Sequence, residues 1–273
     1  MTGSLYDDDP LTPGEREEFE DDLTSFCDRE LDLLGNIVGL NVLYAGGASP
    51  LWLEGLSQRI GESGAVTVIE TDEYRVEQAR HTLHNADLAA PVDLVVGNVF
   101  EVPFRDGGLD LAYSAGLFHE LDVRERSEED ALAELARVVR SGGRVATGDW
   151  VDAGEETPPV DLEWERMEAE LAGEADGARL YGIGPPGRLA ALHEEILDDV
   201  RVHVSSPYPL RHLEKVMLSE PDEPAEWASL SEAARHRLLT RRLALKERIR
   251  REGYSRMATL YVEGRVRKDR PNR

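Results

Sequence analysis

The stretch from Asn41 to Glu70 constrains the fold of this chain more than any other segment. A short apolar run at residues 42–45 breaks at a glycine turn, residues 46–50. A helical segment at 51–60 follows, and a second apolar run at 66–69 ends at Glu70. Backbone N–H groups at a helix N-terminus, with a carboxylate about 20 residues beyond the turn, can bind a nucleoside. The stretch therefore predicts a strand, a ligand-binding turn, a helix and a second strand.

The same alternation continues to residue 150. Further strands are predicted at Val92–Val96, Leu109–Ser114 and Arg144–Trp150. Asp72 and Ser127 are predicted N-caps of the intervening helices, and Ser141-Gly142-Gly143 is predicted to end the second one. Strands that alternate with helices of this length indicate an α/β fold, with a parallel sheet and helices on both faces. Ligands of such sheets bind at the carboxyl ends of the strands.

The second half is less regular. An acidic linker at 152–160 is followed by predicted helices at 162–171 and 188–197, an arginine-rich helix from Ser231 to Glu252, and alternating strands at 200–204 and 258–262. We expect an N-terminal helical cap, 1–40, and one domain, 41–273. Within that domain, residues 41–150 are the expected cofactor-binding half, and residues 151–273 carry a helical lid or insertion.

Composition excludes several classes of protein. The one cysteine, Cys27, excludes an internal disulfide and a multi-cysteine metal site, so no metal is expected. No apolar run approaches the roughly 18 residues of a membrane span, and the acidic N-terminus is unlike a signal peptide. We therefore expect a cytoplasmic protein without a membrane partner.

The order of these motifs resembles the class I S-adenosylmethionine-dependent methyltransferases over roughly residues 41–262. The most family-like segments are VDLVVGNV (92–99) and AELARVVRSGGRVAT (133–147). The resemblance implies a Rossmann-like sheet of seven strands, parallel except for the last, with helices on both faces and here a helical insertion. It also implies S-adenosyl-L-methionine as cofactor and a small-molecule acceptor.

The resemblance assigns site residues by position. It places the cofactor against the glycine turn, the end of the second strand, the loop after the third and the end of the fourth: Tyr44, Gly46, Gly47, Ala48, Ser49, Glu70, Thr71, Asn98, Val99 and Ser114. Within this set, Glu70 would bind ribose and Asn98-Val99 the adenine. His119 and Glu120 follow the fourth strand, where substrate would meet the methyl group. Asp149, Trp150 and Tyr181 are candidates for the acceptor pocket.

The glycine turn departs from the family pattern. Tyr44 stands where an acidic residue is usual, and Ala48 and Pro50 replace glycines. A tyrosine is neutral at neutral pH and cannot replace the anion. The altered turn implies either modest cofactor affinity or a scaffold that has lost catalysis.

His119 has two readings. It can accept a proton from an attacking oxygen or nitrogen, or it can serve packing or helix capping. Many methyl transfers need no base, because alignment of donor and acceptor supplies most of the effect.

The arginine-rich helix leaves a second alternative open. Residues 235–273 contain 14 bases and four acids, hence +10, which leaves −34 on the other 234 residues. Its arginines either pair with this acidic body, which we favour, or contact RNA phosphates. The alternatives to a small-molecule methyltransferase are thus an RNA methyltransferase and a non-catalytic binding or regulatory protein. A NAD-dependent dehydrogenase is disfavoured, because the turn lacks G-x-G-x-x-G.

The charge balance predicts adaptation to salt. The chain has 55 acids, 31 bases and a net charge of −24, and only three of its bases are lysines. A high-GC genome also favours arginine over lysine, so we test the adaptation directly. In chemical unfolding at dilute and at molar NaCl, we expect the free energy of unfolding to rise with salt, because screening removes self-repulsion. Higher stability in dilute buffer would exclude it.

Overall fold

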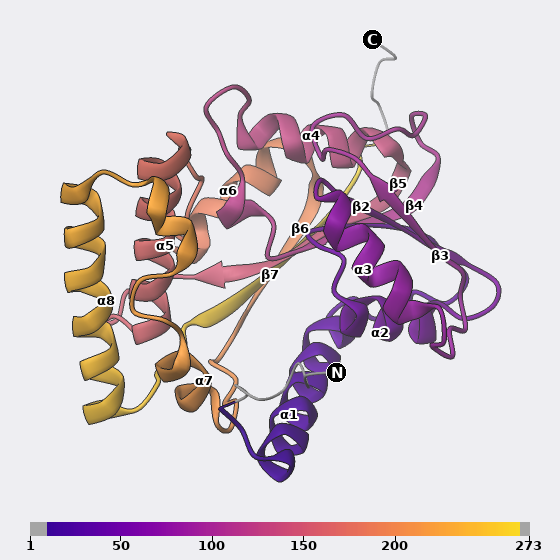
Figure 1. Ribbon diagram of the computed structural model, residues 1–273. Coiled ribbons are helices and arrows are strands. Elements are labelled where there is room, and N and C mark those ends of the chain that lie inside the picture. Colours follow the sequence, from indigo (N-terminus) through magenta and orange to yellow (C-terminus); the bar gives the residue numbers. More distant parts are fainter. Residues whose placement is uncertain (1–9, 268–273) are drawn as a thin grey trace.

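The computed structural model describes residues 10–267 and places seven strands in one sheet (Figure 1). The strands are β1 Asn41–Ala45, β2 Ala65–Glu70, β3 Val92–Val96, β4 Leu109–Ala115, β5 Val139–Val151, β6 Asp198–Ser205 and β7 Ala258–Arg265. Their order is β3-β2-β1-β4-β5-β7-β6. The pairs from β3 to β5 are parallel, and β7 runs antiparallel to both β5 and β6. The predicted seven-stranded Rossmann-like sheet with an antiparallel last strand is confirmed.

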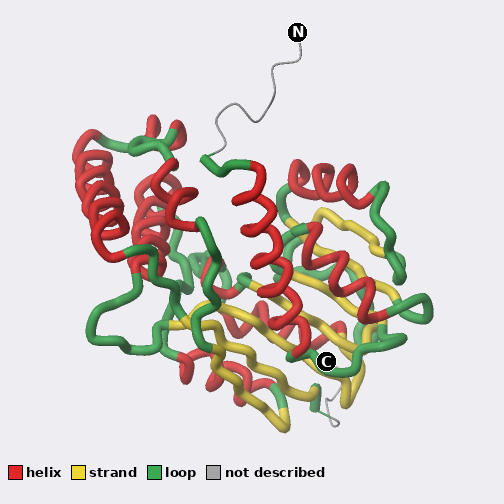
Figure 2. The backbone as a smooth tube through the Cα atoms, turned by 90° about the horizontal axis from the view of Figure 1, so that it is seen from below, coloured by secondary structure: helices red, strands yellow, loops and turns green. Residues whose placement is uncertain are grey.

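Helices connect the strands and cover both faces (Figure 2). They are α1 Pro13–Asp32, α2 Pro50–Ile60, α3 Glu73–Leu83, α4 Glu128–Val138, α5 Val160–Asp176, α6 Pro186–Ile196, α7 Leu213–Ser219 and α8 Glu232–Glu252. Short 3-10 turns, η1 Phe118–Glu120 and η2 Ala225–Ser229, complete the set. Neither α7 nor η2 is predicted above, because both are too short to show a clear periodic pattern.

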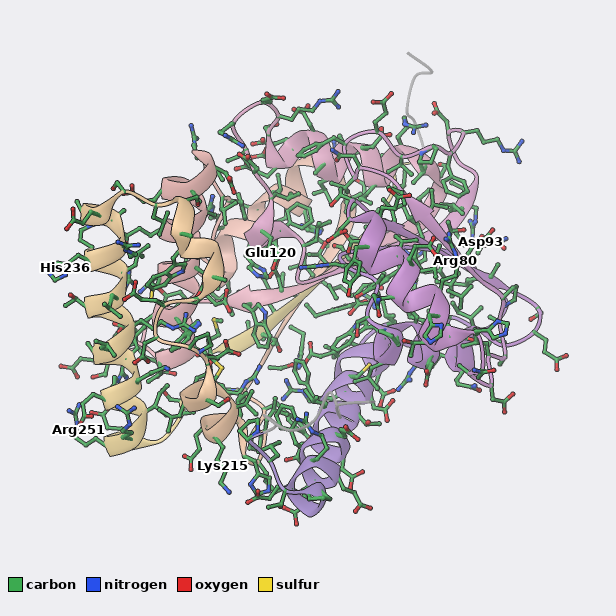
Figure 3. All side chains as sticks on the ribbon, viewed as in Figure 1. Arg80, Asp93, Glu120, Lys215, His236 and Arg251 are labelled. Atoms are coloured by element: carbon green, nitrogen blue, oxygen red, sulfur yellow. The ribbon has the colours of Figure 1, made fainter. Side chains whose placement is uncertain are left out.

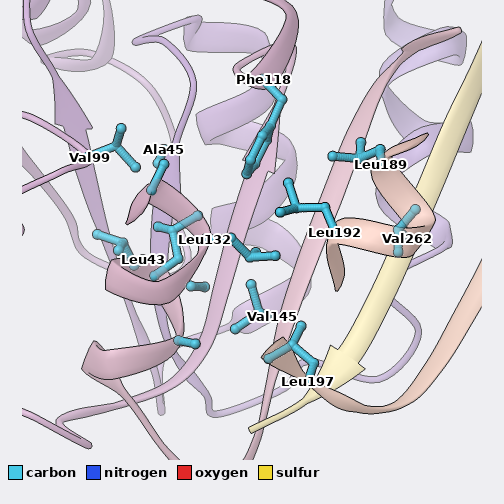
Figure 4. Close-up of a cluster of buried hydrophobic side chains, with 14 of the residues drawn as sticks. Leu43, Ala45, Val99, Phe118, Leu132, Val145, Leu189, Leu192, Leu197 and Val262 are labelled. Carbon is cyan, nitrogen blue, oxygen red and sulfur yellow. The ribbon is translucent and has the colours of Figure 1, made fainter. Parts of the chain in front are cut away.

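Each face of the sheet has its own apolar core. On one face, Leu132 of α4 and Leu192 of α6 pack on strand residues such as Leu43 and Val145 (Figure 4). On the other face, α1 and α2 cover Tyr44 and Tyr113. Alternate strand residues point to opposite faces, so β1, β2, β4, β5 and β7 each supply residues to both cores.

Local sequence sets the helix ends. Thr12 and Glu15 form the capping box that begins α1, and Asp72 and Ser127 cap α3 and α4 as predicted. The end predicted for α4 is wrong, because α4 stops at Val138 and β5 begins at Val139. Val139 already pairs with Leu109 of β4, so strand pairing ends the helix before the glycines are reached.

The arginines of α8 pair with the acidic body, as favoured from the sequence. Arg241 and Arg248 lie 3.1 and 3.5 Å from Glu170 and Glu163 of α5. Lys246 lies 2.6 Å from Asp222. His236 and Arg251 lie on the outer side of α8 (Figure 3). A third apolar core, which includes Trp164, Met167 and Trp227, joins α5 and α8.

The proposed division into a cap and one domain stays a prediction, and residues 1–9 of that cap lie outside the described residues. Across residues 10–267, no helix has both the length and the apolar character needed to cross a bilayer.

The buried histidine of α6, His193, faces the sheet. His193 Nε2 is 3.1 Å from Thr147 Oγ1 in β5, and its Nδ1 is 2.9 Å from the Leu189 carbonyl oxygen. Ser114 Oγ donates to the same Thr147 hydroxyl at 3.1 Å. Burial lowers the pKa of His193 from 6.5 to about 4, so the ring is neutral in the folded protein at neutral pH.

We predict that His193 makes the free energy of unfolding depend on pH in the acid range. The unfolded chain binds a proton near pH 6.5, whereas the folded chain does so only near pH 4. The free energy of unfolding should therefore fall by about 3 kcal/mol as pH drops through this window. His193→Gln should be less stable at pH 7 but lose less stability in this window. Parallel slopes for the two proteins in urea titrations would contradict this.

Candidate functional site

A cavity of about 780 Å³ lies at the carboxyl ends of β1, β2 and β3. Its wall combines the glycine turn, the end of β2, the loop after β3 and the segment after β4. Of the residues predicted from the sequence, it contains Gly46, Gly47, Glu70, Thr71, Asn98, Val99 and Glu120. The parallel sheet brings these residues together from distant parts of the chain.

The glycine turn approaches the neighbouring strand closely. Gly46 and Gly47 have φ of 128° and 117°, values that residues with a Cβ rarely adopt. A Cβ on Gly46 would lie 2.4 Å from the Ala115 carbonyl oxygen at the end of β4. Only glycine fits this position, and the exposed backbone of the turn faces the cavity.

Glu70 faces the turn from the end of β2. Its Oε1 accepts hydrogen bonds from the Asp72 backbone N–H at 3.0 Å and the Thr71 hydroxyl at 3.3 Å. Its Oε2 points toward Gly47, where an added Cβ would lie 3.9 Å away. One carboxylate oxygen therefore fixes the side chain, and the other faces the space above the glycine turn.

Asn98 and Val99 form the next part of the wall. The Asn98 side-chain oxygen accepts from the Phe100 backbone N–H at 3.0 Å, which makes a local turn. The amide nitrogen of Asn98 is the group left to face a ligand. Val99 is buried and supplies an apolar surface.

Four predicted cofactor residues do not line this cavity. Tyr44 is buried on the α2 side of the sheet, and its ring lies 5.6 Å from the ring of Tyr113. Ser114 is buried and bonded to Thr147, Ala48 is buried, and Ser49 is the exposed N-cap of α2. Tyr44 and Ser114 are not among the residues that line the cavity, and a role for them in binding the cofactor stays a prediction.

His119 pairs with Asp149 beside the cavity. The His119 Nδ1 lies 2.6 Å from Asp149 Oδ1, and the side chains are 11% and 3% exposed. Asp149 also accepts from the backbone N–H groups of His119 at 3.1 Å and Trp150 at 2.7 Å. This network fixes both the carboxylate and the ring. Because the carboxylate accepts from Nδ1–H, the Nε2 of a neutral ring is free to accept a proton.

Opposing effects set the pKa of His119. Burial lowers it, but the hydrogen bond and charge of Asp149, with the charges of Glu120 and Glu165, raise it above 6.5. Glu120 lines the cavity, and its Oε1 lies 3.8 Å from His119 Nε2 (Figure 3). Glu120 thus links the cavity to the histidine.

Sequence reasoning missed part of the cavity wall. Asp72 was predicted only as a helix cap, and Arg75 lies on the following turn. Arg124 and Arg126 reach the cavity from the loop before α4. Asp72 and Arg75 could have been predicted from their position directly after β2. Arg124 and Arg126 could not, because a loop has no periodic sequence pattern that predicts its path.

Comparisons with known proteins agree with this geometry. A family model described as a methyltransferase domain matches residues 43–147. The ubiquinone/menaquinone biosynthesis C-methyltransferase UbiE of Pseudoalteromonas translucida is 27% identical over 165 residues, which cover 58% of this chain and 58% of that protein. The chain spans between 32% and 58% of the length of the first three curated relatives it matches.

Solved structures show the same fold. A putative sarcosine dimethylglycine methyltransferase from Galdieria sulphuraria superposes with a TM-score of 0.57 at 16% identity, covering 90% of this chain and 86% of that one. The [4+2]-cyclase SpnF superposes with a TM-score of 0.57 at 17% identity, covering 89% and 82%. Sheet order, site geometry and the family match agree on one region: residues 43–147 match a methyltransferase domain, on the sheet order of the class I S-adenosylmethionine-dependent methyltransferases.

Proposed function

We propose that this protein transfers a methyl group from S-adenosylmethionine to a small-molecule acceptor. The observation that carries this proposal is the position of Glu70 opposite the Gly46–Gly47 turn in one cavity of about 780 Å³. A backbone without Cβ atoms and a carboxylate across from it fit a ligand that carries an amino acid end and a ribose. When bound, the cofactor supplies a methyl group on a positively charged sulfur.

Different residues of this chain would then bind different parts of the cofactor. Glu70 Oε2 is placed to accept from the ribose hydroxyls, since Oε1 is already held by Asp72 and Thr71. The backbone of the turn at the N-terminus of α2 would hold the methionine end. Asn98 and Val99 would contact the adenine through an amide and an apolar surface.

His119 is the proposed proton acceptor. Its Nδ1 is held by Asp149, and Nε2 has Glu120 at 3.8 Å, next to the cavity. In this role the proton of an attacking oxygen or nitrogen passes to Nε2, and the Asp149 carboxylate stabilises the resulting cation. Asp149 is a positioning residue, because it acts through His119.

Two observations favour a small molecule over RNA. Arg237, Arg241 and Arg248 of α8 are paired with glutamates of α5. UbiE, named for ubiquinone and menaquinone biosynthesis, matches 58% of the chain. The fold alone does not specify methyl transfer, because SpnF, a [4+2]-cyclase, has the same fold.

Calorimetry with S-adenosylmethionine and S-adenosylhomocysteine tests the cofactor site. We expect both to bind, and Glu70→Ala to weaken binding roughly 10- to 100-fold, since a hydrogen bond to a charged group contributes about 1.5–3 kcal/mol. Glu77→Ala, in the exposed part of α3, is the matched control and should bind as the wild type does.

The outcomes separate the parts of this proposal. No binding at millimolar cofactor in high salt would defeat the methyltransferase reading. Binding that is unchanged in Glu70→Ala would place the ribose elsewhere. If S-adenosylmethionine binds but is not consumed when mixtures of many candidate acceptors are added, the non-catalytic alternative is favoured.

An NMR titration of the histidine rings tests the His119–Asp149 pair. Asp149→Asn should lower the pKa of His119, because burial then acts without the neighbouring charge. The acid limb of activity, where His119 becomes protonated, should move to lower pH by the same amount. His193 serves as an internal reference whose pKa of about 4 should not change. An unchanged His119 pKa would contradict the pairing.

A further inference from the structure

Arg256 has a charged side chain without a close partner, and it lies at the same end of the sheet as His119. Arg256 stands between α8 and β7, and its side chain is 14% exposed. Its Nε is buried and has no hydrogen-bond partner among the described residues. The Oδ2 of Asp161 lies 4.0 Å from this Nε, at the limit of an ion pair.

Asp161 is already engaged elsewhere. Its Oδ2 accepts from the Met257 backbone N–H at 2.8 Å, and its Oδ1 accepts from the Leu162 backbone N–H at 2.8 Å. These bonds join the first turn of α5 to the start of β7. Asp161 is therefore a structural residue, and it balances the charge of Arg256 only from a distance.

Aromatic rings fix the guanidinium. Its central carbon lies 4.9 Å from the centre of the Trp150 ring and 5.7 Å from that of Phe26. The two rings are stacked at 5.9 Å with an angle of 9°. Such contacts orient the planar group and leave its N–H edge for an acceptor in the plane.

The position of Trp150 relates this arginine to the proposed base. Trp150 follows Asp149 at the end of β5, so their side chains point to opposite faces of the sheet. Asp149 holds His119 on one side, and Trp150 contacts Arg256 on the other. Glu165 of α5 lies near enough to affect the pKa values of both His119 and Arg256. His119 and Arg256 therefore lie at the same end of β5, on opposite faces of the sheet.

We propose that Arg256 binds an anionic group, a carboxylate or a phosphate, of the acceptor molecule. This proposal rests on the proposed function, since it names the chemical class of that reaction's acceptor. A buried cation with an unpaired N–H is unfavourable, and an anion that accepts two parallel hydrogen bonds from the guanidinium removes that cost. On a body of strongly negative charge, a nearly unpaired buried arginine gives the acceptor site its specificity for an anion.

Binding of matched probes to the protein saturated with S-adenosylhomocysteine tests this inference. Benzoate and phenyl phosphate are the anionic probes, and benzamide is the neutral match for benzoate. In ligand-observed NMR we expect at least one anion to bind at least tenfold more tightly than benzamide. The two anions distinguish a carboxylate site from a phosphate site.

Variants assign the preference to Arg256. Arg256→Gln should remove the preference for the anion, and Arg256→Lys should retain part of it. Arg251→Gln, on the exposed side of α8, is the matched control and should leave it unchanged. Each variant is also titrated with S-adenosylhomocysteine, whose affinity should stay the same.

The two proposals fail differently. Loss of S-adenosylhomocysteine binding in the wild type counts against the methyltransferase function. Intact cofactor binding with equal or no binding of benzoate, phenyl phosphate and benzamide overturns the role of Arg256. If Arg256→Gln does not fold, the wild-type probe comparison and Arg256→Lys still decide.

Discussion

The close approach of β1 to β4 at Gly46 sets the geometry on which the site depends. The added Cβ that would lie 2.4 Å from the Ala115 carbonyl shows how little space separates the turn from the neighbouring strand. Parallel pairing of β1 with both β2 and β4 then places Glu70 on one side of this turn and the segment to His119 on the other. The backbone, rather than the side chains, would thereby fix the proposed cofactor and acceptor positions relative to each other.

The sequence predicted elements that carry their own local signals. Apolar runs at β1 to β4 and the caps Asp72 and Ser127 led to the observed strands and helix starts. The prediction of the end of α4 failed because a contact between distant residues determines it. Val139 pairs with Leu109 in the sheet and so does not continue the helix. Tyr44, assigned by position, does not line the cavity, because its side chain is buried on the α2 face of the sheet as strands alternate between faces. The pairing of His119 with Asp149 joins residues 30 positions apart, which no local pattern records.

Charge plays two different roles in this molecule. Along α8 the arginines are matched by glutamates, so the basic helix and the acidic body neutralise each other locally. Exposed pairs of this kind contribute little individually, but together they select one packing of α8 on α5. Arg256 differs, since burial and aromatic contacts replace a close counterion. This difference distinguishes the proposed site at Arg256 from the closely paired arginines of α8.

The adjacency of Asp149 and Trp150 on β5 limits how the length of this strand can vary. The β4–β5 register shifts between Leu109 and Leu111 and is regular from Arg144 to Gly148. Loss of one residue within the regular part would turn Asp149 toward α1 and Trp150 toward η1. The pair of His119 with Asp149 and the contact of Arg256 with Trp150 would then both be lost. A change of length within β5 is compatible with the site before Arg144, where the register shift between Val139 and Arg144 already takes up extra residues.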